Sequence, residues 1–312
     1  MNLRHLCLLL LLLPSALVFG LKTTVAFEDR FLNSVVSVLP TWPQNAGQQR
    51  LEEPEGSGFA YASGGIVATA WHVVGQATAI RVRLADGRQF PAEVIAGDPL
   101  SDIALLRVPV DLPVPERAAP PPLGAKVCAV GNAFGLDLSV TCGVLSASGR
   151  TGIGFNVVED FLQTDAAVNP GASGGALFDE QGRLIGLLSA IFTKESDANI
   201  GVNFAVSVAL LERVAEELLG NGKVRYRSLG LKAEAEITGD GMPALRIVGL
   251  LPDGPAAKAG LQAGDRLLAA AGQPLRSEAA LLRAVQLLSG GEVLSLVFLR
   301  DGERRDLQVS FP

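Results

Sequence analysis

Between Phe31 and Val206 the sequence is a succession of short apolar runs separated by turn-forming residues. Examples of such runs are Ala79–Leu84, Ile103–Val108 and Arg183–Ala190. Runs of this length at this spacing, with few helical stretches between them, indicate β-strands. The chain has 35 glycines and 18 prolines but only 5% aromatic residues, a composition that favours many turns over a helical bundle. The pattern therefore predicts an all-β barrel or sandwich.

A proline-rich stretch, Pro113–Pro122, interrupts this region. Proline lacks a backbone N–H, so the stretch cannot be an interior strand or helix. We interpret it as the connector between two β-barrels, each contributing half of a cleft. Further on, Ser207 is expected to cap a helix over Val208–Leu219, which Gly220-Asn221-Gly222 ends. This is the clearest domain boundary in the chain.

The residues after this boundary predict a second, smaller domain. Its expected helix runs from Glu278 to Leu288, with Ser277 as the cap. Its expected strands are Leu245–Leu250, Arg266–Ala270 and Leu294–Leu299.

The N-terminus has the pattern of an export leader. Arg4 and His5 precede a Leu-rich run from Leu6 to Leu21, and small residues would allow cleavage after Ala26. An uncleaved membrane anchor is the alternative, because the run is only slightly short of a bilayer span. Export is expected on both interpretations, and the choice between cleavage and anchoring stays open.

Charge and cysteine content narrow the class of protein further. The net charge is −6 and no basic run occurs, which argues against a nucleic-acid partner. Cys7 lies in the leader, and Cys128 and Cys142 stand symmetrically about Gly135 in what reads as two strands around a turn. They are either a cross-strand disulfide or two buried thiols, and both interpretations remain open. Neither cysteine has metal-site spacing, so no metal is expected.

Three residues in separate motifs suggest hydrolytic chemistry. The chain has two histidines and His5 lies in the leader, so any imidazole base in the exported part is His72. Asp102 opens an apolar strand, where a carboxylate needs a partner. Ser173 lies between glycines. Each alone has an ordinary structural interpretation: a structural histidine, a turn aspartate and a glycine-rich turn. In His–Asp–Ser order within β context they predict a catalytic triad.

The residue types around Ser173 suit a nucleophile. A serine that attacks a carbonyl needs amide groups aimed at the oxyanion that forms, and Gly171 has no Cβ to obstruct the required turn. We expect the amides of Gly171 and Ser173 to form this oxyanion hole. His72 would accept the Ser173 proton, and Asp102 would hold the imidazole tautomer.

These motifs resemble the HtrA (Deg) family of ATP-independent serine proteases. The similar segments are Thr69–Val74, Ser101–Leu106, Val130–Gly135, Gln163–Ala167 and Asn169–Gly175. The resemblance implies a mainly β, chymotrypsin-like double β-barrel. It also implies a substrate-pairing strand with the Ser189 hydroxyl near Asp102, and Ala167 at the base of the primary specificity pocket. Because Ala167 offers no carboxylate to pair with a basic side chain, cleavage after small or medium aliphatic residues is expected. Residues 200–205 would form another wall of this pocket.

The chain departs from the family pattern near the site. Ala172 stands where the family usually has Asn, Trp71 replaces the Asn before the histidine, and Ala133 replaces a Pro. These departures bear on the resting geometry of the site more than on its chemistry.

The second domain resembles a PDZ domain. Its carboxylate-binding loop would be Arg227-Ser228-Leu229-Gly230-Leu231, and the segment 254–268 is similar to the bacterial central segment. Amides near Leu229, Gly230 and Leu231 would cradle a terminal carboxylate. The peptide would add as a strand opposite the 278–288 helix.

These observations predict residues 1–26 as signal peptide or anchor, 27–220 as a trypsin-like serine protease domain and 221–312 as a PDZ domain. The expected function is an envelope or periplasmic endopeptidase that degrades unfolded or signalling proteins without ATP or cofactor. The resemblance implies a homotrimer built through N-terminal segments that include 27–32. It also suggests that PDZ ligands activate the oxyanion loop, with 149–156 as a relay. A catalytically silent chaperone or scaffold is the alternative, and an esterase is poorly supported because Ser173 is not in a strand-to-helix elbow.

Overall fold

The computed structural model describes residues 31–43, 56–191 and 201–311. The leader, 1–26, lies outside these residues, and so does most of the segment 27–32 predicted to assemble a trimer. Among the residues described, no helix is long and apolar enough to cross a membrane.

The first six strands close into a barrel, in the order β1-β2-β3-β6-β5-β4. Its strands are β1 Val35–Thr41, β2 Gly56–Ala62, β3 Ile66–Ala70, β4 Ala79–Arg83, β5 Gln89–Asp98 and β6 Ile103–Arg107. All neighbours pair antiparallel. Every residue of β3 is buried, because one face fills the barrel and the other is covered by the rest of the domain.

The next six strands close into a second antiparallel barrel, in the order β10-β11-β12-β9-β8-β7. Its strands are β7 Lys126–Gly131, β8 Ser139–Arg150, β9 Phe161–Thr164, β10 Ala176–Asp179, β11 Leu184–Ile191 and β12 Asn203–Ser207. The proline-rich stretch connects the two barrels, as predicted. Within it, Arg117 forms an isolated parallel β-bridge with Leu184. The expected double barrel is thus confirmed.

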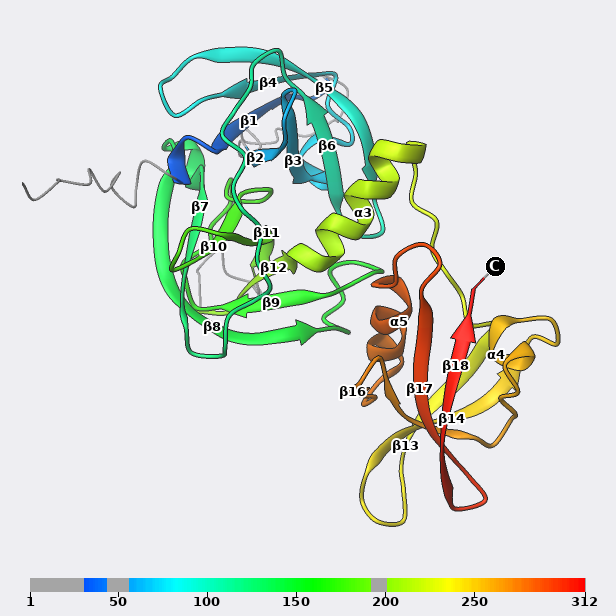
Figure 1. Cartoon of the computed structure of the whole chain (residues 1–312). Helices are drawn as coiled ribbons and strands as arrows, with labels where there is room; N and C mark the ends of the chain where they lie inside the picture. The colour runs from blue at the N-terminus through cyan, green and yellow to red at the C-terminus, as the bar shows by residue number, and fades with distance from the viewer. Residues whose placement is uncertain (1–30, 44–55, 192–200, 312) are drawn as a thin grey trace, which may run out of the picture.

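Helix α3, Val208–Asn221, follows the second barrel and returns across the first. The Ser207 hydroxyl caps it by accepting from the Leu210 amide at 3.2 Å, and Gly222 ends it at φ 69°. Its apolar stripe packs against β5, β6 and β11. The helix therefore ties the two barrels together and leads the chain into the C-terminal domain (Figure 1).

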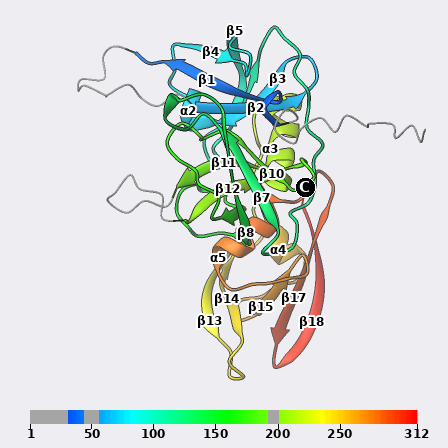
Figure 2. The same cartoon turned by 90° about the vertical axis from the view of Figure 1, so that its left-hand side faces the viewer.

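The C-terminal domain is an antiparallel sheet with two helices. The strands β13 Leu231–Ile237, β14 Pro243–Leu250, β15 Arg266–Ala270, β17 Val293–Arg300 and β18 Glu303–Ser310 lie in this order, and β16 Gln273–Pro274 pairs with β15. The helices are α4 Pro255–Lys258 and α5 Glu278–Gln286. Ser277 caps α5 through the Ala280 amide, as its sequence predicts. Helix α5 faces the second barrel in both views (Figures 1 and 2).

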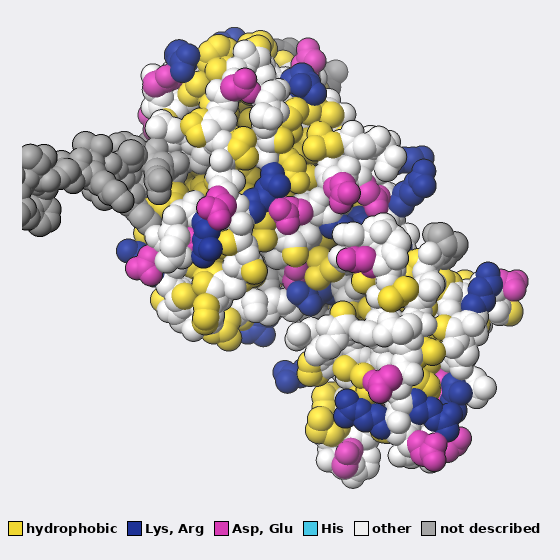
Figure 3. Space-filling view, viewed as in Figure 1, with side chains coloured by type: hydrophobic (Ala, Val, Ile, Leu, Met, Phe, Trp, Pro, Cys, Tyr) yellow, Lys and Arg dark blue, Asp and Glu magenta, His cyan; other side chains and the backbone are white. Residues whose placement is uncertain are grey.

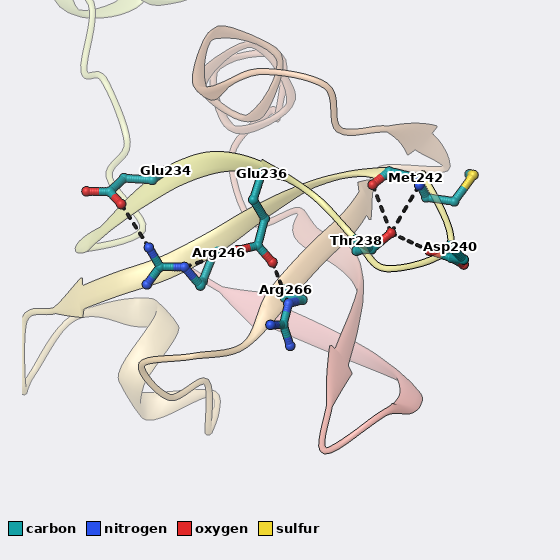
Figure 4. Close-up of polar contacts among 7 residues, drawn as sticks. All are labelled: Glu234, Glu236, Thr238, Asp240, Met242, Arg246 and Arg266. Carbon is teal, nitrogen blue, oxygen red and sulfur yellow. Dashed lines mark hydrogen bonds and ion pairs between the residues drawn. The ribbon is translucent and has the colours of Figure 1, made fainter.

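Strand β13 is the edge strand of this sheet, and ion pairs hold it to its neighbours (Figure 4). Arg246 on β14 lies 2.9 Å from Glu234 and 3.1 Å from Glu236, both on β13. Arg266 on β15 also pairs with Glu236. Exposed pairs contribute little singly, but this linked set favours one register of an edge strand whose backbone pairs with β14 alone.

Basic and acidic side chains are interspersed over both domains on the face that Figure 3 shows.

Candidate active site

His72 and Asp102 come from two different connections of the first barrel. His72 lies in the single turn α2, Trp71–Val74, directly after β3, and Asp102 lies in the turn between β5 and β6. One carboxylate oxygen accepts from the His72 backbone N–H at 2.8 Å, and the other lies 2.7 Å from Nδ1. The His72 side chain is 52% exposed and that of Asp102 is 10% exposed. The carboxylate thus orients an imidazole whose outer edge is open to substrate.

The turn that carries Asp102 has an unusual backbone. Asp102 has φ 60°, a left-handed conformation that non-glycine residues rarely adopt. A carboxylate oxygen of Asp98 accepts from the Ser101 amide at 2.8 Å and from the Ser101 hydroxyl at 2.5 Å. These bonds close the turn and keep Asp102 directed at α2.

Ser173 is held against the first barrel by Ser57 on β2. The Ser57 amide donates to the Ser173 carbonyl at 2.8 Å, and the Ser57 hydroxyl donates to the Gly171 carbonyl at 2.7 Å. Gly171 and Gly174 have φ values of 94° and 85°, and a Cβ at residue 174 would lie 2.2 Å from the Ser57 carbonyl oxygen. Glycine is therefore needed at both positions for the left-handed turns, and at Gly174 also for the close approach to the first barrel.

The Ser173 hydroxyl makes its hydrogen bond to β11. It donates to the Ser189 carbonyl at 3.3 Å, and among the residues described it has no hydrogen bond to His72. The Ser189 hydroxyl donates to Asp102 at 3.4 Å, as the family resemblance implies. The structure thus brings His72, Asp102, Ser173 and Ser189 into one site. Proton transfer from Ser173 to His72 would first require the hydroxyl to leave the Ser189 carbonyl.

The two amides predicted to stabilise an oxyanion are available. The amides of Ala172, Gly174 and Gly175 donate to backbone carbonyls. Within the described ranges, the amides of Gly171 and Ser173 have no acceptor. Two neighbouring free N–H groups beside a nucleophile are the arrangement that stabilises a tetrahedral oxyanion.

Ala167, the residue predicted for the primary pocket, is exposed and lies shortly after the end of β9. Its carbonyl accepts from the Thr141 hydroxyl at 2.5 Å, and Asn203 donates to the neighbouring Ala166 carbonyl at 2.9 Å. Ile200, part of the expected second wall, lies outside the described residues. The assignment of this pocket remains a prediction.

The predicted peptide groove is a cavity of about 470 Å³ between β13 and α5. Its lining includes Ser228, Leu229 and Leu231 from the loop, with Leu281 and Val285 from the helix. Apolar walls beside a turn of backbone amides suit the end of a peptide chain.

Contacts around Gly230 and Gln286 shape the loop of this groove. The Gly230 amide, expected to bind a carboxylate, here donates to the Ser228 hydroxyl at 3.1 Å. The buried Gln286 of α5 accepts from the Arg227 amide at 3.1 Å and donates to the Arg227 carbonyl at 2.7 Å. The loop is therefore fixed to the helix that forms the opposite wall.

The C-terminal domain is joined to the second barrel by an ion pair. Arg283 of α5 lies 2.5 Å from Asp160, whose side chain is 3% exposed and also accepts from the Ser207 hydroxyl. The neighbouring Glu159 accepts from amides of Ile153 and Gly154, both at 2.8 Å, and so closes the loop 152–158. The helix that forms one wall of the cavity and a loop of the second barrel thus share one contact region.

Cys128 and Cys142 face each other across β7 and β8, with a Cα–Cα distance of 4.1 Å, and their sulfurs are bonded. In the part of the chain that the structure describes, no group of His, Cys, Asp and Glu side chains has the arrangement of a metal site.

Comparison with known proteins agrees with this architecture. Residues 56–187 match the family model of the trypsin-like peptidase domain, and residues 246–300 match that of the PDZ domain. The solved structure of the HtrA-type protease AlgW with a tripeptide superposes with a TM-score of 0.73 at 32% identity, covering 92% of this chain and 96% of that one. This chain belongs to the HtrA family of serine proteases.

Curated relatives extend the comparison of this HtrA-family chain. It is 40% identical over 294 residues to a probable periplasmic serine endoprotease DegP-like of Pseudomonas fulva, covering 91% of this chain and 61% of that protein. It is 38% identical over 271 residues to periplasmic serine endoprotease DegP of Escherichia coli K12, covering 83% and 57%. The chain therefore spans about three fifths of the length of these relatives.

The sequence did not reveal three supports of this HtrA-type site. The first is the Ser57 brace, the bond from the Ser57 hydroxyl to the Gly171 carbonyl. The second is the Gln286 clasp, the two bonds from Gln286 to the backbone of Arg227. The third is the Arg283–Asp160 ion pair. A serine between two glycines at the start of β2 was a faint signal for the first. The other two join residues far apart in the chain, with no local pattern to mark them.

Proposed function

We propose that this HtrA-family chain is a periplasmic serine endopeptidase that acts on protein substrates through His72, Asp102 and Ser173. The observation that carries the proposal is the constellation itself. An oriented imidazole, a serine hydroxyl and two free amides lie in one site between the barrels. The relatives named as periplasmic endoproteases support both the activity and the compartment.

The proposed chemistry follows from the contacts around each group. Ser173 attacks the scissile carbonyl and forms a bond from Oγ to carbon while His72 Nε2 takes the hydroxyl proton. The amides of Gly171 and Ser173 stabilise the oxyanion, and His72 then returns the proton to the leaving amine. Asp102 at 2.7 Å holds Nδ1 protonated and stabilises the imidazolium. Water hydrolyses the acyl-enzyme by the same proton route.

The PDZ groove is proposed to bind C-terminal peptides and, through them, to capture substrates or activate the protease. The related AlgW structure, which holds a tripeptide, supports a peptide ligand. The Arg283–Asp160 pair and the Glu159-closed loop support a relay, because they place α5 against the protease domain. A homotrimer, an inner-membrane anchor and unfolded or signalling proteins as substrates belong to the same proposal. The proposal also includes a primary pocket with Ala167 at its base and cleavage after small or medium aliphatic residues of the substrate.

Labelling of the full chain with a fluorophosphonate tests the proposal directly. Wild type should be labelled at Ser173 and should cleave an unfolded protein, whereas Ser173→Ala should do neither. Ser34→Ala is a matched control, because Ser34 is another buried serine and its hydroxyl donates locally, to the Phe31 carbonyl. Peptide binding without labelling or cleavage would instead favour the silent chaperone or scaffold.

A further inference from the structure

The segment between α3 and the PDZ domain touches the turn that carries Asp102. The hydroxyl of Tyr226 donates to a carboxylate oxygen of Asp98. The same oxygen accepts from the amide and the hydroxyl of Ser101, the residue immediately before Asp102. Residues 226 and 98 are 128 positions apart in sequence, so this contact exists only in the folded chain.

The position of this turn decides the geometry of the triad. Asp102 is held at φ 60°, outside the conformations that its residue type prefers, so its backbone relaxes when the closing bonds weaken. Its carbonyl accepts from the Trp71 amide at 3.1 Å, and its carboxylate makes both contacts to His72. A shift of the turn therefore changes the hold on the imidazole.

Neighbouring groups keep Tyr226 in place. The guanidinium of Arg213, on α3, lies 5.7 Å from the centre of the phenol ring and donates to the Arg225 carbonyl at 2.8 Å. Burial, and then the hydrogen bond to Asp98, raises the pKa of Tyr226. The phenol therefore keeps its proton at neutral pH and remains a hydrogen-bond donor to Asp98.

The other side of Tyr226 leads to the peptide groove. The next residue, Arg227, lines that groove, and its amide and carbonyl are both bonded to Gln286 of α5. The linker is thus fastened to the PDZ helix at residue 227 and to the Asp102 turn at residue 226.

We propose that Tyr226 is a positioning residue for the protease, which holds the Asp98–Asp102 turn and through it the orientation of His72. The inference builds on the proposed triad. It makes the linker to the PDZ domain part of the support of the active site. Tyr226 itself touches neither substrate nor the reacting atoms.

Tyr226→Phe in the full chain is the test, because it removes one hydroxyl and keeps the ring. Tyr61→Phe is the matched control, since the chain has two tyrosines and Tyr61 packs beneath Arg117 away from the triad. The first readout is the NMR chemical shift of the proton that lies between His72 Nδ1 and Asp102, with His72→Ala assigning the signal. A proton in a short charge-assisted hydrogen bond resonates far downfield, so a loosened Asp102 should move this signal upfield in Tyr226→Phe but not in Tyr61→Phe.

The second readout is kcat/KM with a peptide substrate. Tyr226→Phe should lower kcat/KM about tenfold, the typical worth of a hydrogen bond to a charged group. In the Asp98→Ala background the same change should have no further effect, because the hydroxyl has lost its acceptor.

The proposal is overturned if Tyr226→Phe leaves the signal of the Nδ1 proton at the wild-type position, even when the protein is less stable. Additive effects of Tyr226→Phe and Asp98→Ala on that signal would overturn it as well. The NMR measurement does not require turnover. A wild type that neither labels nor cleaves would therefore refute the proposed function while this experiment still decides the role of Tyr226.

Discussion

Arg283 on the PDZ helix α5 lies 2.5 Å from Asp160 at the edge of the second barrel, and Asp160 is almost fully buried. This pair connects the wall of the peptide groove to the protease domain. The adjoining loop 152–158 is closed by Glu159, the residue before Asp160, and on the proposed function the pair would form a route between peptide and protease.

Arg283→Ala should therefore uncouple the two domains. Loss of a partner of a buried charge costs about 1–3 kcal/mol once the partial exposure of Arg283 is allowed for, enough to reduce peptide stimulation about tenfold. Turnover with and without a C-terminal peptide measures the stimulation, and fluorescence anisotropy checks that peptide affinity is kept. Arg305→Ala, which breaks an exposed pair with Glu303, should change nothing. Full stimulation in Arg283→Ala would contradict this route.

Ser57→Ala should damage catalysis without removing any triad side chain. The change takes the hydroxyl from the Gly171 carbonyl and from the Asn132 amide, which donates to it at 2.8 Å. Because this loop carries the amides proposed to stabilise the oxyanion, we expect kcat to fall about ten- to hundredfold with little change in KM. Steady-state kinetics beside Ser34→Ala provide the measurement. An equal loss in both serine variants would point to stability alone.

Gln286→Ala should weaken peptide binding. It removes two hydrogen bonds that fasten Arg227 to α5, so the carboxylate loop becomes free to move. We expect the Kd for a peptide with an apolar C-terminal residue to rise about tenfold, equivalent to about 1.4 kcal/mol. Calorimetry on the full chain gives the value. Gln308→Ala, at an exposed position of β18, should bind like wild type, and a matching loss there would refute the clasp.

Reduction of the Cys128–Cys142 disulfide should lower thermal stability. The bond closes a loop of 14 residues, for which chain entropy predicts about 3 kcal/mol. Because the strands already pair at this position, the measured effect should be smaller, about 1–2 kcal/mol, or a fall of several degrees in Tm. Thermal unfolding with and without dithiothreitol measures it. A Cys128→Ser, Cys142→Ser double variant should have a Tm that does not respond to dithiothreitol, and a wild type equally insensitive would contradict the prediction.

Much of the architecture follows from local patterns. Short apolar runs between glycines and prolines predicted the double barrel, and Ser207 and Ser277 predicted where two helices begin. Element ends were less certain: α3 continues to Asn221 because Gly222, rather than Gly220, adopts the left-handed cap. The fold class depends on periodicity and turn chemistry, which each segment carries by itself.

The sequence alone also determined which residue types were available for chemistry: one exported histidine, an aspartate opening a strand and a serine among glycines. Only the tertiary structure decided how they are held. The turn of the Ser173 hydroxyl toward Ser189, the Ser57 brace and the contact of Tyr226 with Asp98 all join segments that are distant in the chain. Such contacts depend on how closed barrels stack and where the linker returns, and long-range packing of this kind leaves no mark on local residue patterns.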